Sequence, residues 1–367
     1  MQDKEYMKKA LLLAKKGQDF VSPNPLVGAV VVKNGKIIGQ GYHQKYGDLH
    51  AERKALESCI QSPQDATMYV TLEPCCHFGK TPPCCDAIIN SGIKKVVVAT
   101  LDPNPLTSGK GIKALKTAGI QVVVGVLERE SQAMNEVFFH YIKTKTPFVV
   151  MKYAMTADGK IATATGKSKW ITGEKARENV HKDRSRYSAI MVGVQTVIAD
   201  NPMLTSRIEN AKNPVRIICD TSLRTPINSQ IIKTSNNIKT IIATSSTNNE
   251  LKEKFKNQGC KIIEIPQKNS HIDLQVLMQK LGQTQIDSIL LEGGSTLNFS
   301  ALNSEIVNKV QAYVSPKIFG GECAKTPVGG VGFLSPDKCI KLVDKTVEIF
   351  DDDILIQGQV SYECLQE

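Results

Sequence analysis

Short apolar runs alternate with segments of helical periodicity along this chain, and this alternation limits the choice of fold most. Two apolar runs, 22–32 and 37–43, flank Asn34-Gly35, a pair typical of a tight β-hairpin turn. Further apolar runs lie at 67–75, 94–100 and 121–126, and segments of helical periodicity lie at 4–16, 50–60, 82–92, 112–119 and 128–143. The pattern predicts an α/β sandwich with a largely parallel sheet.

A second α/β pattern begins after a polar joint at 144–147 that ends in Pro147. We therefore expect two domains, 1–145 and 146–367. The second pattern opens with 147–162. It continues with expected strands at 189–194, 215–219, 239–244, 261–265 and 287–292, and with expected helices at 173–186, 250–258 and 273–282.

The charge of the chain is positive but diffuse. Its 46 Lys and Arg residues and 36 Asp and Glu residues give a net charge of +10, and no run of five like charges occurs. A diffuse positive field favours anionic ligands such as phosphates, whereas nucleic-acid binders concentrate their charge in a patch.

No segment has the ~18 apolar residues that span a bilayer, and the apolar run 10–14 is too short for a signal-peptide core. We expect a cytoplasmic protein that binds neither nucleic acid nor membrane.

Four of the ten cysteines, at positions 75, 76, 84 and 85, fall within eleven residues. Without an export signal a disulfide framework is not expected, so this cluster points to metal or thiolate chemistry. His50-Ala51-Glu52 opens an expected helix upstream. One neutral imidazole and two thiolates suit tetrahedral Zn²⁺ and leave one position for water. Glu52 would then carry protons beside that water. A purely structural zinc, or Cys76 or His77 as a ligand, remains an alternative at this stage.

His-x-Glu followed by Pro-Cys and a later Cys is the signature of zinc nucleobase deaminases, although eight residues rather than two separate Cys75 from Cys84. TLEPCCHFGKTPPC at 71–84, together with PNPLVGAVVV at 23–32 and His-Ala-Glu, resembles the deaminase half of the RibD family, which has this longer loop. The resemblance implies a cytidine-deaminase-like α/β/α sandwich, one Zn²⁺ per chain on His50, Cys75 and Cys84, and Glu52 as the catalytic proton carrier. Asn24, between two prolines, is either a turn residue or a reader of a pyrimidine edge.

The second half lacks a Gly-x-Gly-x-x-Gly after a strand, so it does not predict a standard Rossmann site. Instead, LEGGSTL at 291–297 follows an apolar run and leads into a helix. Glycines there let the backbone approach a pyrophosphate at the helix N-terminus, although a tight turn alone would use the same residues. With 152–162, 166–173, 181–202, 204–207 and 219–226, this segment resembles the reductase half of the RibD family, in the same order.

That resemblance implies a dihydrofolate-reductase-like α/β domain that uses NADPH. The residues that would contact NADPH are Ala154, Trp170, Thr196, Asp200, Ser222, Gly293, Gly294, Ser295 and Thr296. Those that would contact the substrate are Ser168, Arg184, Leu204, Arg207 and Glu292. Arg184 and Arg207 offer planar forks suited to a phosphate. The roles of Lys152 and Arg224 stay open.

The resemblance as a whole implies a bifunctional enzyme of riboflavin biosynthesis. It would deaminate 2,5-diamino-6-ribosylamino-4(3H)-pyrimidinone 5′-phosphate and then reduce 5-amino-6-(5-phosphoribosylamino)uracil to the ribityl product. Its partners would be these phosphorylated pyrimidines and further copies of the chain, in a dimer or tetramer. Two alternatives stay open: a deaminase acting on nucleic acid, and a zinc-stabilised nucleotide-binding protein without turnover.

Overall fold

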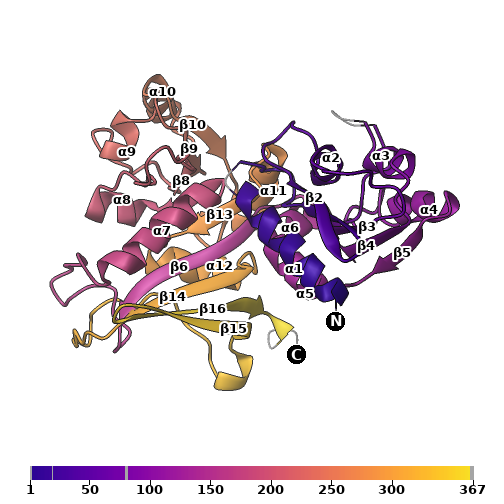
Figure 1. The fold of residues 1–367 in the computed structure, drawn as a ribbon. Helices are drawn as coiled ribbons and strands as arrows, with labels where there is room; N and C mark the ends of the chain where they lie inside the picture. The colour runs from indigo at the N-terminus through magenta and orange to yellow at the C-terminus, as the bar shows by residue number, and fades with distance from the viewer. Residues whose placement is uncertain (1, 19, 79–81, 364–367) are drawn as a thin grey trace. The chain divides into compact units, whose positions relative to one another are not determined.

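The computed structural model describes residues 2–18, 20–78 and 82–363, so positions 79–81 of the 71–84 stretch lie outside the described residues. The chain divides into two compact units, Met1–Thr144 and Lys145–Glu367. In Figure 1 the first unit is indigo to purple and the second runs from magenta to yellow. Within the described residues, no helix has the length and apolarity needed to cross a membrane.

Unit 1 contains a five-stranded sheet in the order β2-β1-β3-β4-β5. Its strands are β1 (Gly28–Lys33), β2 (Lys36–Tyr42), β3 (Thr67–Leu72), β4 (Lys95–Thr100) and β5 (Gln121–Val124). The expected hairpin forms: Asn34 and Gly35 take φ values of 50° and 74°, and β1 pairs antiparallel with β2. However, β1 is also antiparallel to β3, and only β3–β4 and β4–β5 are parallel. The expectation of a largely parallel sheet is therefore wrong for this unit, because only the crossovers through helices produce parallel neighbours.

Helices cover both faces of this sheet, which confirms the α/β/α sandwich. They are α1 (Gln2–Ala14), α2 (Ala51–Glu57), α3 (Cys84–Asn90), α4 (Lys110–Thr117), α5 (Glu128–Met134) and α6 (Glu136–Thr144). Alternate strand residues face opposite sides. Val31, Val70 and Val98 pack with residues of α2, α3 and α4. Val30, Tyr69 and Val97 pack with residues of α1.

The expected closing helix at 128–143 is two helices, α5 and α6, separated at Asn135. The buried Asn135 amide accepts from the Leu26 N–H at 2.8 Å and donates to the Leu26 carbonyl at 3.0 Å. Both polar edges of this side chain are therefore satisfied by the segment that enters β1. The break between α5 and α6 thus coincides with a contact between Asn135 and Leu26, which are 109 residues apart. Local periodicity does not predict such a contact.

Unit 2 contains a nine-stranded sheet in the order β10-β9-β8-β7-β13-β6-β14-β16-β15. All pairs from β10 to β14 are parallel, and the last two pairs are antiparallel. The strands are β6 (Phe148–Thr156), β7 (Ala189–Gly193), β8 (Val215–Cys219), β9 (Thr240–Thr244), β10 (Lys261–Glu264), β13 (Ser288–Leu291), β14 (Lys309–Ser315), β15 (Lys341–Phe350) and β16 (Asp353–Ser361). A short separate hairpin joins β11 (Gln267–Lys268) and β12 (His271–Ile272).

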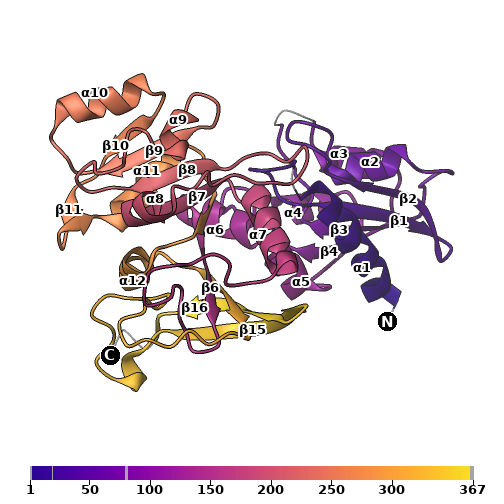
Figure 2. The ribbon, with the colours of Figure 1, turned by 90° about the vertical axis from the view of Figure 1, so that its left-hand side faces the viewer.

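The helices of unit 2 pack on both faces of its sheet (Figure 2). One apolar cluster joins the sheet to α11 (Leu274–Gln283) and α12 (Ser295–Asn303). Another joins it to α8 (Val194–Asp200), α9 (Gln230–Lys233) and α10 (Asn249–Asn257). A third joins α7 (Glu174–Arg186) to Tyr313 of β14 and Leu355 of β16. Every strand and helix expected in this unit forms, with small shifts of its ends.

Candidate functional site

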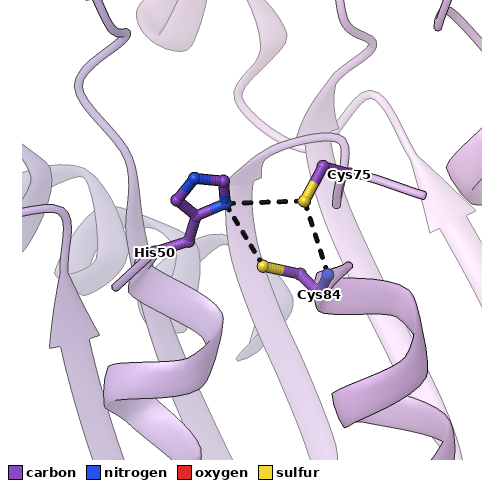
Figure 3. Close-up of side chains that lie close together, drawn as sticks. All are labelled: His50, Cys75 and Cys84. Atoms are coloured by element: carbon purple, nitrogen blue, oxygen red, sulfur yellow. Dashed lines mark hydrogen bonds between the residues drawn. The ribbon is translucent and has the colours of Figure 1, made fainter. Parts of the chain in front are cut away.

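Three separate segments of unit 1 meet at the carboxyl end of β3. His50 immediately precedes α2 in an extended conformation, Cys75 lies in the loop after β3, and Cys84 is the first residue of α3. Figure 3 shows the three side chains turned toward one another. Pro83, before Cys84, lacks a backbone N–H and suits a helix start.

The distances within this group match a metal site. The Nδ1 atom of His50 lies 3.5 Å from the Cys75 Sγ and 3.4 Å from the Cys84 Sγ. Zinc bonds of ~2.0–2.1 Å to nitrogen and ~2.3 Å to sulfur give a tetrahedral N···S edge of about 3.6 Å. The three ligand atoms lie within 4.8 Å of one another, and the described residues contain no other such group of three His, Cys, Asp or Glu residues.

The structure separates the other candidate ligands from this group. The half-buried Cys76 packs against the apolar cluster of the sheet, whereas His77 is exposed at the cavity rim. Cys85 is 1% exposed, and its Sγ lies 3.5 Å from the Pro74 carbonyl oxygen. Cys59 is half-buried and bonds the Ala55 carbonyl within α2. Of the four clustered cysteines, only Cys75 and Cys84 face His50.

The electrostatics of the group favour a bound cation. The hydrogen bond from Cys84 holds the pKa of the Cys75 thiol well below its usual value, and His50 adds to this effect. The same contact and burial raise the pKa of Cys84. The two sulfurs therefore share one proton near neutral pH, and a metal ion would displace it. Burial and the adjacent Cys75 charge raise the pKa of the Glu52 carboxyl to about 7.

Beside this group lies a cavity of about 330 Å³, a size suited to a small molecule. Asn24, His43, Glu52, Glu73 and Asp102 are among its lining residues. The Asn24 amide nitrogen lies 3.1 Å from the His43 Nε2, and the His43 Nδ1 lies 3.3 Å from the Leu49 carbonyl oxygen. This arrangement suits a neutral imidazole with the proton on Nδ1, and burial lowers the pKa of His43 accordingly.

Most candidate residues of unit 2 lie at the carboxyl edge of its parallel strands. Ala154 is near the end of β6, Thr196 and Asp200 are on α8 after β7, and Ser222 follows β8. Gly293 to Thr296 form the connection from β13 into α12. Because β8, β7, β13 and β6 are neighbours in the sheet, these places line one edge, where ligands bind in open α/β sheets.

Two of these connections touch directly. The Gly193 N–H donates to the Gly293 carbonyl oxygen at 2.7 Å. A Cβ placed on Gly294 would lie 3.5 Å from the Thr196 Oγ1, an ordinary contact distance, so the starts of α12 and α8 approach each other here. Two helix N-termini, those of α8 and α12, therefore lie side by side at the same edge.

Arg184 and Glu292 form a two-bonded ion pair within unit 2. The Arg184 Nε and Nη2 donate to the two Glu292 oxygens at 2.7 and 2.8 Å, and Nη1 donates to the Thr205 carbonyl at 3.1 Å. Burial alone would raise the pKa of Glu292, but the charges of Arg184 and Lys152 lower it to about 2. The sequence suggested that the Arg184 guanidinium could bind a phosphate. In the structure, this guanidinium instead binds the Glu292 carboxylate.

The remaining candidates differ in accessibility. Trp170 is 58% exposed, with the Arg177 guanidinium 4.7 Å from its ring centroid, so it is not a core anchor. The Ser168 hydroxyl bonds Asp200 at 3.4 Å. The Leu204 side chain is buried in the cluster beneath α8, which leaves only its backbone for a ligand. Arg207, Ser222 and Arg224 are exposed.

The Lys152 side chain is partly buried within unit 2. Its ammonium lies 5.7 Å from the Tyr313 ring centroid, and burial lowers its pKa. Glu73 and Phe138 of unit 1 are among the cavity residues that had no role from the sequence. Glu73 directly precedes Pro74-Cys75, a signal that could have identified it, whereas no local signal marks Phe138.

The folds and sites define a zinc-binding deaminase domain followed by a reductase domain, and comparisons with known proteins agree. Residues 1–100 match the model of the cytidine and deoxycytidylate deaminase zinc-binding region. Residues 147–356 match the model of the RibD C-terminal domain.

Full-length relatives cover both units. The riboflavin biosynthesis protein RibD of Actinobacillus pleuropneumoniae is 55% identical over 97% of this chain and 95% of its own length. RibD of Aquifex aeolicus is 46% identical over 96% and 97%. The crystal structure of a diaminohydroxyphosphoribosylaminopyrimidine deaminase/5-amino-6-(5-phosphoribosylamino)uracil reductase from Thermotoga maritima is 40% identical, with a TM-score of 0.85 over 98% of this chain and 99% of that one.

The chain belongs to the RibD family of bifunctional riboflavin-biosynthesis deaminase–reductases. Membership confirms the fold expected from the resemblance, a deaminase-like first domain and a dihydrofolate-reductase-like second domain. It also removes the alternative of a binding protein without enzymatic activity.

Proposed function

We propose that unit 1 hydrolytically deaminates 2,5-diamino-6-ribosylamino-4(3H)-pyrimidinone 5′-phosphate and that unit 2 reduces 5-amino-6-(5-phosphoribosylamino)uracil with NADPH. The two activities named for the similar Thermotoga maritima protein support this choice of substrates. The observation that carries the first step is the His50, Cys75 and Cys84 group beside a cavity that also contains the buried Glu52.

The residues of unit 1 fit one zinc ion per chain. One imidazole nitrogen and two sulfurs at tetrahedral edge distances are the donor set of catalytic zinc, and His50, Cys75 and Cys84 would hold it. Zinc held there would lower the pKa of the attacking water toward ~7. Glu52 would take one proton from the attacking water and deliver it to the ring nitrogen, and would then pass the remaining hydroxyl proton to the amino group, which leaves as ammonia as the carbonyl forms. Glu52 is 3% exposed and lines the same cavity as His50 and Cys75, so it is placed for this transfer.

The carboxyl edge of the unit 2 sheet suits NADPH and the sugar phosphate. Ala154, Trp170, Thr196, Asp200 and Ser222 would contact the cofactor, and the backbone from Gly293 to Thr296 would approach its pyrophosphate at the N-terminus of α12. When bound, NADPH supplies the hydride that reaches C1′ of the sugar. The protein residues position the two partners.

Five residues would contact the substrate: Ser168, Arg184, Leu204 through its backbone, Arg207 and Glu292. The low pKa of Glu292 keeps it ionised at neutral pH, so it accepts hydrogen bonds from sugar hydroxyls. The exposed guanidinium of Arg207 would meet the phosphate.

Association of copies of this chain, as a dimer or tetramer, and a cytoplasmic location are also part of the proposal. The outermost strand β15 exposes Val347 by 64% and Ile349 by 74%, and an exposed edge strand can pair with another chain. The nine described cysteines are free, as in a reducing compartment. Light scattering of the Val347→Lys variant tests the association, because a smaller assembly is expected.

The decisive experiment is mass spectrometry of the products formed by zinc-loaded protein. Deamination without NADPH adds about one mass unit to the diamino substrate. Reduction after NADPH is supplied adds about two more. If neither shift occurs, the proposed activities are wrong, and single-stranded nucleic acid becomes the next substrate to test.

Substitutions on α2 test whether Glu52 carries out proton transfer in the deamination step. Glu52→Gln is expected to keep zinc and the reductase activity but to lose deamination. The matched control is Glu57→Gln, an exposed residue on the same helix, which is expected to keep both activities. Deamination that survives in Glu52→Gln would refute the assigned role.

A further inference from the structure

A second buried carboxylate borders the deaminase cavity, and the mechanism above does not use it. Glu73 is 6% exposed and directly follows β3. Its Oε2 accepts from the N–H groups of Asp102 at 3.2 Å and Gly109 at 2.9 Å. Its Oε1 accepts from those of Gly111 at 2.9 Å and Ile112 at 3.2 Å. A carboxylate has about four acceptor positions, so these four donors saturate it.

These contacts join two segments that the sequence keeps apart. Glu73 begins the turn that carries Cys75, whereas its four donors belong to the loop 101–109 and the first turn of α4. The negative charge therefore satisfies the exposed N–H groups at the start of this helix. Both oxygens of Glu73 are thus occupied by backbone N–H groups, and the side chain ties β3 to the loop and to α4.

The same junction is tightly packed through its backbone. A Cβ on Gly111 would lie 2.1 Å from the Pro74 carbonyl oxygen, so the two segments are in direct contact. The Cys85 Sγ, from α3, lies 3.5 Å from that carbonyl and 3.7 Å from the Gly111 carbonyl. The Glu73-Pro74 peptide is thus held between α3 and α4, immediately before Cys75.

The loop held by Glu73 forms one wall of the cavity through Asp102. The Asp102 carboxylate is turned into its own loop, where it accepts from the Asn104 N–H and the Thr107 hydroxyl, both at 2.9 Å. The loop thus has an internal network, and it is anchored to the metal side of the cavity through Glu73.

We propose that Glu73 is a positioning residue for the deaminase, which fixes the 101–109 wall of the cavity and thereby sets substrate affinity. It takes no part in proton transfer. This inference rests on the proposed deaminase activity of unit 1.

The test uses Glu73→Gln in the full-length, zinc-loaded protein. A glutamine keeps one accepting oxygen, but its amide group faces two N–H donors instead of accepting from them. We expect the zinc content and the reductase activity to stay unchanged, and the deaminase KM to rise about tenfold or more with kcat within about threefold. Hydrogen exchange of the amides in 102–112 should accelerate about tenfold. Glu57→Gln, on the exposed face of α2, is the matched control.

Each other outcome overturns the proposal. Unchanged KM and unchanged exchange would mean that Glu73 does not hold the wall. A fall in kcat at constant KM would mean a chemical role, and loss of zinc would mean a general structural one.

If Glu73→Gln does not fold, Thr107→Ala removes a single hydroxyl, which contacts Asp102 and the Asn104 carbonyl, and it should raise KM in the same direction, though less. Thr107→Ala with a wild-type KM would then refute the proposal. Failure of the proposed function would look different, since the wild-type protein itself would not deaminate.

Discussion

The buried ion pair between Arg184 and Glu292 makes a quantitative prediction about the stability of unit 2. The two side chains are only 16% and 12% exposed. The pKa of Glu292, at about 2 instead of the ordinary 4.5, corresponds to about 3 kcal/mol of folding stability at neutral pH. Because the pKa is lowered on folding, this contribution is complete above pH 4.5 and is lost as the pH falls toward 2.

Glu292→Gln removes the charge at nearly constant volume and leaves the Arg184 guanidinium buried without its counterion. Removing one partner of a buried pair costs about 3–5 kcal/mol. We therefore expect the free energy of unfolding of unit 2 to fall by about 3 kcal/mol at pH 7. At pH 3 the wild-type carboxylate contributes only about 1 kcal/mol, so the difference between the two proteins should shrink.

Urea unfolding followed by tryptophan fluorescence measures this difference, because Trp170 is the single tryptophan and lies in unit 2. The matched control is Glu250→Gln, which removes an exposed i,i+4 pair with Lys254 and should leave the unfolding free energy nearly unchanged. Equal stability of Glu292→Gln and wild type at pH 7 would refute the reasoning. A difference that stays undiminished at pH 3 would refute it as well.

Four further substitutions test the metal group and the packing. Cys84→Ser should lose bound zinc while Cys76→Ser keeps it, as measured by metal analysis; the reverse would contradict the ligand set. Gly28→Ala places a Cβ 2.0 Å from the Ala10 carbonyl oxygen, so we expect thermal unfolding of unit 1 to begin at lower temperature while the reductase stays active. Arg216→Met removes a buried guanidinium that donates to three backbone carbonyls, and it should destabilise unit 2 by about 3 kcal/mol in urea titrations.

Local patterns predicted the elements of the fold well because local forces produce them. Short continuous apolar runs require a covered strand, and Asn34-Gly35 accepts the positive φ values of the hairpin turn. The pattern did not predict the antiparallel pairing of β1 with β3, because strand order depends on contacts between distant segments. The interruption at Asn135 has the same cause, since its partner Leu26 lies 109 residues away.

For the candidate sites, too, the sequence predicted some features and only the structure showed others. The residue types around His50, Cys75 and Cys84 pointed to zinc, and the resemblance selected these three from several candidates. The structure places them together and turns Cys76 and Cys85 elsewhere. Trp170 and Leu204 have surroundings that their residue types did not predict, because Trp170 is exposed and the apolar cluster beneath α8 buries Leu204. Their ligand roles stay predictions.

The sequence by itself determined the succession of strands and helices along the chain, the chemistry of the metal ligands and the family, since these depend on residue identity and spacing. Only the tertiary structure decided which groups form hydrogen bonds or ion pairs with each buried charged side chain. Glu73 and Glu292 are both buried acidic residues after apolar strands, yet one accepts four backbone N–H groups and the other pairs with Arg184. The partner of a buried charge is set by segments brought together in folding, and no local pattern specifies it.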